Sequence, residues 1–382
     1  MAEARYTPLR ERHESLGASF TDFGGWQMPV RYTSDLAEHH AVRRAAGLFD
    51  ISHMAEFVID GPDAAAYLDY ALAGRLSTMA VGKAKYSLLL AETGGVIDDV
   101  IVYRLAEDRF LIISNAGNRD AVAEALGERV RAFMHGLVVD EEDAARRGVG
   151  MEDVSDSFAL IAVQGPASEA IVSAIDGITE VGTPWSAQKY YAWTDASFRG
   201  QPLVIARTGY TGEDGFELLI KADGAAALWD AALAAGEPHG LVPAGLAARD
   251  TLRLEAGMPL YGHELSLDIK PAQAGLGRVV ASDKDDFVGK DAVAPASDAR
   301  VLVGLTADGK RAGRAGYAVV ADDDAVVGEI TSGALSPTLG HPIAMAYIVP
   351  SSAEEGTTVY LDVRGTKIPA TVTALPFYRR KK

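Results

Sequence analysis

The chain of 382 residues contains no cysteine. Disulfide bonds, thiolate zinc sites, cysteine nucleophiles and cysteine-ligated clusters are therefore excluded, and a reducing cytoplasm is the simplest setting. The charged N-terminal stretch has no apolar core or cleavage signal, and no apolar run is long enough to span a membrane. We therefore expect a cytoplasmic protein with no membrane partner.

Basic residues are few relative to acidic ones. Asp and Glu number 53 against 36 Lys and Arg, which gives a formal charge of −17. Nucleic acids and anionic membranes bind proteins through a basic surface, so neither is expected as the main partner. Any anionic ligand must be bound by a few local Arg or Lys side chains. The length allows about two or three domains with ordinary cores.

Two segments in the first half of the chain are similar to each other. His53–Leu72 and Ser157–Ile175 each combine a strand-like run, a Gly-Pro pair and a helical run, with the proline where a first helical turn tolerates it. Each is followed by three more strand-like runs and a helix, predicted at 120–130 and 224–235. This repeat predicts two related α+β modules. From Arg300 onward, short strand-like runs alternate with Gly, Asp and Pro, which predicts a small all-β barrel or sandwich.

One strand-like run, Gly94–Tyr103 (GGVIDDVIVY), contains two adjacent acids. Because side chains alternate between the two faces of a strand, Asp98 and Asp99 cannot share an environment. The acid that faces inward loses solvent, which favours its neutral form and prepares it for proton transfer near neutral pH. The alternative is a strand end with one solvated acid and one acid that caps a turn.

A glycine-rich segment, Arg207–Leu218 (RTGYTGEDGFEL), contains a further candidate acid. Glu217 lies between Phe216 and Leu218 in a strand pattern, so it points to the opposite face. A carboxylate fixed there could accept two hydrogen bonds from a flat, N–H-rich heterocycle. The alternative is a hairpin with a solvated acid. The glycine spacing does not match a dinucleotide-binding fingerprint, and the segment leads into a strand.

A helix is predicted at Pro243–Gly257. It places Arg249 and Arg253 one turn apart on a shared face, where they are the best local cations for an anionic ligand. The alternative is surface pairing with Asp250 and Glu255.

Other motifs receive ordinary interpretations. His39 and His40 lie in a helix predicted to end near residue 46, and without further ligands at workable spacing we expect them to be helix-surface residues. Asn115 follows a strand and is expected to be a turn residue rather than a ligand contact. The stretch 304–311 (GLTADGKR) resembles a phosphate-binding loop, but Arg311 replaces the required Ser or Thr, so we reject that site. The basic residues 379–382 are expected to form a frayed tail or, as the sharper hypothesis, to dock an acidic partner.

Short stretches between Thr7 and Arg379 together carry a family resemblance. In order they are TPL, FGGWQMPV, FDISHM, GGVIDDVIVY, VQGP, RTGYTGEDGFE, AGLAARDTLRLEAGMPLYG, FVGK, EITSGALSPTLG and PFYR. Each stretch is weak alone, but their number and order are specific. The chain resembles the T-protein family, the aminomethyltransferases of the glycine cleavage system.

That resemblance implies a three-domain, cloverleaf-like α+β fold with tetrahydrofolate in a central hole. We expect a first α+β module at residues 1–50 and 155–275, an inserted second module at 51–154, and a C-terminal β-barrel domain at 285–382. The family takes an aminomethyl group from the lipoyl arm of the H-protein, transfers the one-carbon unit to tetrahydrofolate and releases ammonia. The expected partners are therefore the lipoylated H-protein and tetrahydrofolate as a co-substrate.

The resemblance also implies roles for individual residues. Asp99 matches the catalytic carboxylate, Glu217 matches the acid that binds the pterin ring, and Asp98 is expected to be structural. The positions that match residues lining the folate site are Met54, Tyr86, Ile101, Tyr103, Tyr191, Tyr210 and Arg249. No metal is expected.

Two other functions remain open for a chain of this kind. Folate-dependent demethylases of the same fold keep the folate site and differ around the second substrate. Non-catalytic folate-binding proteins that assist iron–sulfur assembly carry a cysteine in a KGCYxGQE-like segment. The matching segment here reads RTGYTGED and the chain has no cysteine, which argues against the second alternative.

Overall fold

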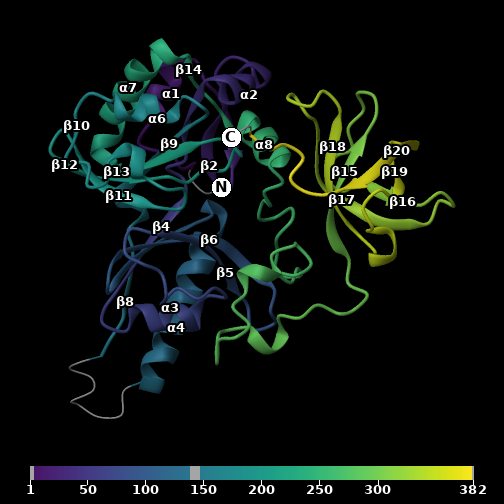
Figure 1. The fold of residues 1–382 in the computed structure, drawn as a ribbon, viewed down its shortest axis with the longest axis horizontal. Helices are drawn as coiled ribbons and strands as arrows, with labels where there is room; N and C mark the ends of the chain where they lie inside the picture. The colour runs from purple at the N-terminus through teal and green to yellow at the C-terminus, as the bar shows by residue number, and fades with distance from the viewer. Residues whose placement is uncertain (1–3, 138–146, 381–382) are drawn as a thin grey trace.

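The computed structural model describes residues 4–137 and 147–380. Figure 1 shows three lobes: an upper lobe, a lower lobe, and a barrel at the right, with helix α8 (Leu246–Glu255) between the upper lobe and the barrel. Strands from both sides of the expected insertion build the upper lobe, whereas the lower lobe is continuous in sequence. The domain boundaries given above stay a prediction.

The upper lobe is built on a seven-stranded sheet in the order β10-β11-β12-β13-β9-β3-β14. In chain order, its strands are β3 (Ala46–Asp50), β9 (Phe158–Gln164), β10 (Ile178–Thr179), β11 (Trp193–Phe198), β12 (Gln201–Ala206), β13 (Gly215–Lys221) and β14 (Leu241–Pro243). The helices of this lobe are α1 (Arg10–Ser15), α2 (Asp35–Arg44), α6 (Ser168–Ser173) and α7 (Ala225–Gly236), and β1 (Ser19–Phe23) and β2 (Trp26–Arg31) form a separate hairpin. Its core lies between the sheet and α6 and α7, where Ile171, Leu228 and Trp229 are fully buried.

The lower lobe is built on a five-stranded antiparallel sheet in the order β5-β6-β7-β4-β8. Its strands are β4 (Ala55–Asp60), β5 (Ala84–Leu90), β6 (Val96–Ala106), β7 (Arg109–Ser114) and β8 (Gly150–Asp153). Helices α3 (Ala64–Ala71) and α4 (Arg119–Leu137) cover one face, and their apolar residues pack on Phe57, Val100 and Ile112. The opposite face is therefore free to meet the upper lobe.

The C-terminal lobe is a closed barrel in the order β15-β18-β17-β16-β19-β20. Its strands are β15 (Val301–Ala307), β16 (Ala318–Val320), β17 (Val326–Leu335), β18 (Pro342–Ile348), β19 (Thr358–Val363) and β20 (Thr366–Thr373). The barrel prediction is confirmed, and closure leaves no exposed sheet edge. Between β15 and β16, the described residues around Lys310 contain no helix, in agreement with the rejection of a phosphate loop.

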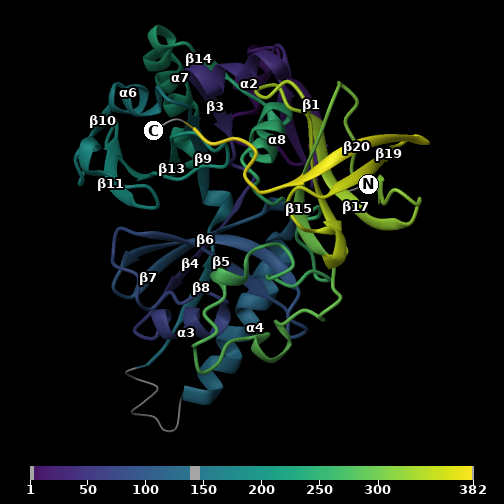
Figure 2. The same ribbon diagram turned by 45° about the vertical axis from the view of Figure 1, so that its right-hand side comes forward.

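The two sheets meet through a shared apolar cluster. Phe49 and Leu160 from the upper sheet pack with Val58, Tyr103 and Leu111 from the lower sheet. The segment after α8 then runs down beside the lower lobe before it reaches the barrel (Figure 2). It packs there as an apolar cluster with β5 and β6. The upper lobe therefore meets the lower lobe at β6, and it meets the barrel at α8.

Helix boundaries differ from the predictions at three places. The helix expected to continue to about residue 46 ends at Arg44, because Ala46 already pairs in β3. The helix expected from Pro243 begins at Leu246, because Pro243 pairs in β14. Helix α4 extends well beyond residue 130. Strand pairing across the sheet decides the first two boundaries, and local sequence does not contain that information.

The interpretation of His39 as a surface residue is wrong. Its side chain is fully buried, and its ring nitrogens lie 2.7 Å from Thr251 Oγ1 and 2.8 Å from Thr338 Oγ1. It also lies 3.3 Å from the carboxylate of Glu255. His40 is only partly buried. His39 therefore joins α2 to α8 and to the barrel loop that contains the SGALSPTLG stretch.

The basic tail is partly bound within the chain. Arg380 Nη1 lies 3.4 Å from Asp214 Oδ1, and its guanidinium lies 5.9 Å from the centre of the Tyr190 ring. Lys381 and Lys382 lie outside the described residues. The docking hypothesis stays a prediction, and Arg380 already has an acidic neighbour in this structure.

Candidate active site

The two adjacent acids lie on β6 at the edge of the interface between the lobes. Asp98 is fully buried, whereas Asp99 is only partly buried. Strand alternation predicts this difference in exposure. The separation is nevertheless incomplete, because the side-chain amide of Asn115 contacts both carboxylates.

Asp98 is surrounded by hydrogen-bond donors. Its Oδ2 accepts from the backbone N–H of Asn115 at 2.9 Å, and its Oδ1 accepts from the amides of Asn115 and Asn118 at 2.8 and 2.6 Å. Burial and the neighbouring charge of Asp99 raise the pKa of Asp98 to about 7, although these donors oppose the shift. An acid with this many internal contacts has little capacity left for a ligand.

Asp99 is held on both sides by neighbouring strands. Tyr86 on β5 donates a hydrogen bond to Oδ2 at 3.1 Å, and Asn115, which follows β7, donates to Oδ1 at 2.7 Å. Burial raises the pKa of the Asp99 carboxyl, and the hydrogen bonds from Tyr86 and Asn115 oppose this shift. Asp99 is therefore the acid of the pair that can both meet a ligand and exchange a proton.

Glu217 lies across the interface on β13. It is 7% exposed, so the alternative of a solvated acid is wrong. Thr208 donates a hydrogen bond to its carboxylate, and the hydroxyl of Tyr103 lies 3.2 Å from the same Thr208 hydroxyl. Burial raises the pKa of Glu217, whereas Thr208 and the charge of Arg249 lower it. Tyr103 comes from the lower lobe, so this chain of contacts joins the two sheets.

Arg249 lies on α8 beside Tyr210. Its guanidinium carbon is 5.0 Å from the centre of the Tyr210 ring, and its Nη1 is buried without a hydrogen-bond partner among the described residues. Burial lowers the pKa of Arg249, and the charge of Glu217 opposes this effect. A buried guanidinium nitrogen without a partner is costly unless a ligand supplies an acceptor.

Arg253 is not available for a ligand, so the pairing of the two arginines as anion-binding cations is wrong for this residue. Its guanidinium donates to Asp250 at 2.8 Å, to Glu264 at 2.9 Å and to Ser332 at 2.8 Å. Ser332 lies on barrel strand β17, so Arg253 joins α8 to the barrel. Arg249 and Arg253 lie one helical turn apart, but only Arg249 remains a candidate for ligand binding.

The remaining candidates surround these polar groups. Met54, Ile101 and Tyr191 pack in the same cluster as Tyr103 between the sheets. Tyr191 adopts a positive φ of 56°, and its carbonyl accepts from the backbone N–H of Ala84 at 2.9 Å, across the interface.

The tyrosines also lie close to Asp99. Burial raises the pKa of Tyr86, Tyr191 and Tyr210, and the charge of Asp99 adds to the shift of each. The structure thus gathers all the candidate residues into one region.

The sequence analysis did not identify three polar residues of this region. It assigned Asn115 to a turn only, and it assigned no role to Asn118 or Thr208. The carbonyl of Asn115 does accept from the backbone N–H of Asn118 in a turn at 3.0 Å, but its side chain binds the two acids. The register of the β6–β7 hairpin explains these contacts. Tyr103 pairs with Leu111 and Ile101 with Ile113, so two more residues along each strand bring Asp99 opposite Asn115.

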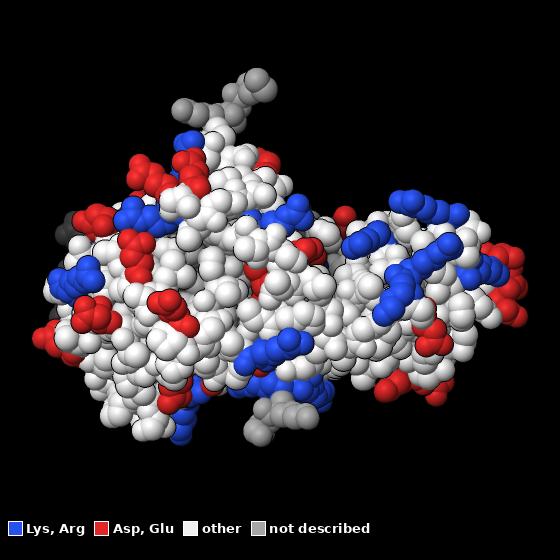
Figure 3. Space-filling model, turned by 90° about the horizontal axis from the view of Figure 1, so that it is seen from above, with Lys and Arg blue, Asp and Glu red and all other residues white. Residues whose placement is uncertain are grey.

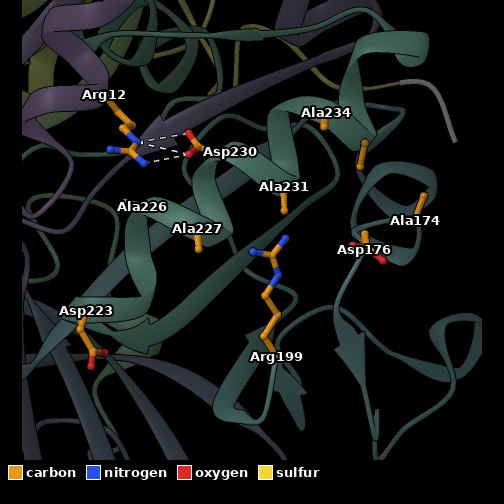
Figure 4. A pocket seen from close by; sticks show the side chains of 11 residues that line it. Arg12, Ala174, Asp176, Arg199, Asp223, Ala226, Ala227, Asp230, Ala231 and Ala234 are labelled. Atoms are coloured by element: carbon orange, nitrogen blue, oxygen red, sulfur yellow. Dashed lines mark hydrogen bonds and ion pairs between the residues drawn. The ribbon is translucent and has the colours of Figure 1, made fainter.

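A surface hollow of about 700 Å³ lies elsewhere, on the outer face of the upper lobe. Figure 4 shows its lining, in which Arg199 points toward the alanines of α7 and Arg12 pairs with Asp230 of the same helix. None of the candidate residues lines this hollow. Shape alone therefore does not select the candidate site, which we infer from the buried polar groups at the lobe interface.

Comparison with known proteins identifies the family of the chain. The family described as the GCVT N-terminal domain matches residues 9–284, and the family described as the glycine cleavage T-protein C-terminal barrel domain matches residues 300–379. The chain belongs to the glycine cleavage T-protein family. It is 53% identical to an aminomethyltransferase of Cutibacterium acnes and 52% identical to one of Saccharopolyspora erythraea, each comparison covering 100% of both chains.

A solved structure is similar over the whole length. The crystal structure of glycine cleavage system aminomethyltransferase T from Bartonella henselae matches with a TM-score of 0.86 and 35% identity, covering 100% of both chains. The expected fold class and enzyme class are therefore confirmed: the chain is a folate-dependent aminomethyltransferase of the glycine cleavage system. Among the described residues, no helix combines the length and the apolar character needed to cross a membrane.

Proposed function

We propose that this chain takes the aminomethyl group from the lipoyl arm of an H-protein and transfers its one-carbon unit to tetrahydrofolate, with release of ammonia. The products are methylenetetrahydrofolate and dihydrolipoyl H-protein. The observation that carries the proposal is a half-buried carboxyl, Asp99, that shares the lobe interface with a buried acid, Glu217, and with Arg249, whose Nη1 has no partner in the part of the chain that the structure describes. The two carboxyl groups can accept hydrogen bonds and the guanidinium can donate one. This combination suits a flat heterocycle that carries both N–H donors and acceptor atoms.

In this proposal Asp99 is the catalytic residue. Cleavage of the carbon–sulfur bond requires a proton at the departing sulfur or amine, and transfer requires a folate amine held in place. A desolvated carboxyl with a raised pKa is suited to both tasks. Tyr86 and Asn115 orient it through its two oxygens.

Glu217 and Arg249 are proposed to bind the pterin ring. Thr208 already donates to Glu217, which fixes the carboxylate while leaving further acceptor capacity for ring N–H groups. Tyr103, Tyr191, Tyr210, Met54 and Ile101 are proposed to line the folate site. Apolar and aromatic side chains of this kind exclude water from a reactive carbon.

The proposed protein partner is the lipoylated H-protein. Seen from above, Lys and Arg side chains gather over the right-hand lobe, the barrel, although the chain as a whole carries a charge of −17 (Figure 3). Such a local basic surface suits an acidic protein. We further propose a cytoplasmic location, since a cysteine-free chain fits a reducing compartment.

The direct test is release of ammonia from aminomethylated lipoyl H-protein, with and without tetrahydrofolate. Strong folate-dependent release supports the proposal. Tight folate binding without release contradicts it and favours a folate-dependent demethylase of the same fold.

Substitutions of the same type distinguish the roles of Asp98 and Asp99. Asp99→Asn is expected to lower kcat by at least about 100-fold, because general acid–base catalysis contributes about 10² to 10⁴. Its KM for tetrahydrofolate should change less than about threefold. Asp108→Asn, an exposed aspartate in the turn after β6, is the control and should retain native turnover. Full turnover in Asp99→Asn with loss in Asp98→Asn means that the two roles are reversed.

A further inference from the structure

The contacts of Asn115 give it a specific relation to the catalytic carboxyl. Its Nδ2 lies 2.8 Å from Asp98 Oδ1 and 2.7 Å from Asp99 Oδ1, so one amide group bridges both acids. Its backbone N–H donates to the other oxygen of Asp98 at 2.9 Å. Asn115 is itself only partly buried.

The chemistry of the groups fixes the orientation of this amide. The amide nitrogen Nδ2 is the atom that lies within hydrogen-bond distance of both carboxyl groups, so the NH₂ end donates and the carboxyl oxygens accept. An NH₂ group has two hydrogens, one for each carboxylate. Asp98 holds the amide and the main chain of Asn115 at the same time, and Asn118 holds Asp98 from the far side at 2.6 Å.

The same contacts place Asp99 in a two-point clamp. Asn115 holds Oδ1, and Tyr86, on the strand at the other side of β6, holds Oδ2 at 3.1 Å. With the Asn115 amide removed, Tyr86 is the one side chain that still binds this carboxylate among the described residues. The carboxylate could then rotate about its Cβ–Cγ bond.

We propose that Asn115 is a positioning residue, whose amide fixes the direction of the Asp99 carboxylate toward the reacting atoms. Asp98 is the anchor of that amide, which explains why two adjacent acids occur on one strand. The inference rests on the proposed function, since it requires Asp99 to be the reacting carboxyl. A misplacement of about 1 Å at a reacting group can lower the rate about 100-fold.

The test compares Asn115→Ala with Asn118→Ala, which removes an identical side chain that contacts Asp98 but not Asp99. Asn115→Ala is expected to lower kcat by about 10- to 100-fold, with a change in the KM for tetrahydrofolate below about threefold. Asn118→Ala is expected to lower kcat by less than about threefold. Thermal unfolding and circular dichroism report whether each variant is folded, and Asn115→Ser replaces Asn115→Ala if the latter is not.

A double-mutant cycle separates positioning from a general structural role. In the Asp99→Asn background, Asn115→Ala should have little further effect on single-turnover ammonia release, because the group that it orients is already disabled. An equal loss in both backgrounds overturns the inference, and so does an equal effect of Asn118→Ala. If Asp99→Asn alone keeps native turnover, the assignment of Asp99 fails instead, which distinguishes the two failures.

Discussion

At the scale of single residues, burial determines which side chains are prepared for chemistry. Asp99, Glu217 and Arg249 are each shifted in pKa first by loss of solvent and then by a few named neighbours. Burying such groups costs folding free energy, and their concentration at one interface between lobes is typical of a functional site. Arg253 carries the same type of side chain one turn later, but its carboxylate and hydroxyl partners make it structural.

Glu217→Gln tests the binding role at this scale. The substitution keeps the volume but replaces one acceptor oxygen by a donor, which would face a ring N–H or the Thr208 hydroxyl. We expect the Kd for tetrahydrofolate, measured by titration calorimetry, to rise by about 10- to 100-fold, since a hydrogen bond to a charged group contributes about 1.5 to 3 kcal/mol. Glu169→Gln, on α6 of the same lobe, is the control. Unchanged folate affinity in Glu217→Gln contradicts the assignment.

At the scale of elements, buried polar groups fasten short segments that have little apolar surface of their own. Helix α1 is held to the end of β3 by Asp50, which accepts from Thr7 at 2.6 Å and lies 2.8 Å from His13 Nε2. The other nitrogen of His13 lies 2.8 Å from the Tyr32 hydroxyl. Burial tends to raise the pKa of Asp50, but the hydrogen bonds from His13, Thr7 and Ser52 lower it below its ordinary value.

Asp50→Asn is therefore expected to destabilise the upper lobe. Removing the carboxylate deprives buried hydrogen-bonding groups of their acceptor, and each buried polar group left unsatisfied costs about 1 to 3 kcal/mol. Chemical denaturation followed by tryptophan fluorescence measures the loss, since Trp229 packs 5.2 Å from His13 between ring centres. Asp35→Asn, at an exposed position of α2, should lose less than about 0.5 kcal/mol. A similar small loss for Asp50→Asn would show that this cluster does not stabilise α1.

At the scale of the whole molecule, one buried carboxylate joins the upper lobe to the barrel. Glu255 at the end of α8 accepts from Arg43 on α2 at 2.8 Å, from Ser336 at 2.5 Å and from the backbone N–H of Thr338 at 2.9 Å. Its carbonyl also accepts from Tyr378 in the C-terminal segment at 2.8 Å. The lobes are thus held by a polar network as well as by apolar packing.

This network predicts a loss of stability in acid. Burial alone would raise the pKa of Glu255, but His39, Ser336 and Arg43 lower it to about 2, from an ordinary value of 4.5. Because the folded-state pKa is depressed, the carboxylate contributes stability above pH 4.5 that is lost as the pH falls toward 2. We expect Glu255→Gln to lower the melting temperature clearly at pH 7, and the difference from the unsubstituted chain to shrink below about pH 4.

Glu237→Gln, at an exposed position after α7, is the control for this pH series and should follow the unsubstituted chain throughout. A difference for Glu255→Gln that stays constant between pH 7 and 3 would contradict the linkage. The measurement needs only thermal unfolding at a series of pH values.

Periodicity and spacing in the sequence were sufficient to predict the two α+β modules, the barrel and the contrast between Asp98 and Asp99. They succeed because alternation along a strand and one-turn spacing along a helix are local properties. The ordered motifs were sufficient to predict the family, which the comparisons confirm. The residue roles in the site stay predictions.

Only the tertiary structure decided what each side chain faces. His39 is buried because Thr251 and Thr338 approach it from more than 200 residues away in the chain. Asn115 is not simply a turn residue, because the register of β6 and β7 brings its amide to both acids. A sequence pattern determines the face on which a side chain lies. Whether that face meets solvent, a partner or a ligand depends on chain segments that fold against it from far away.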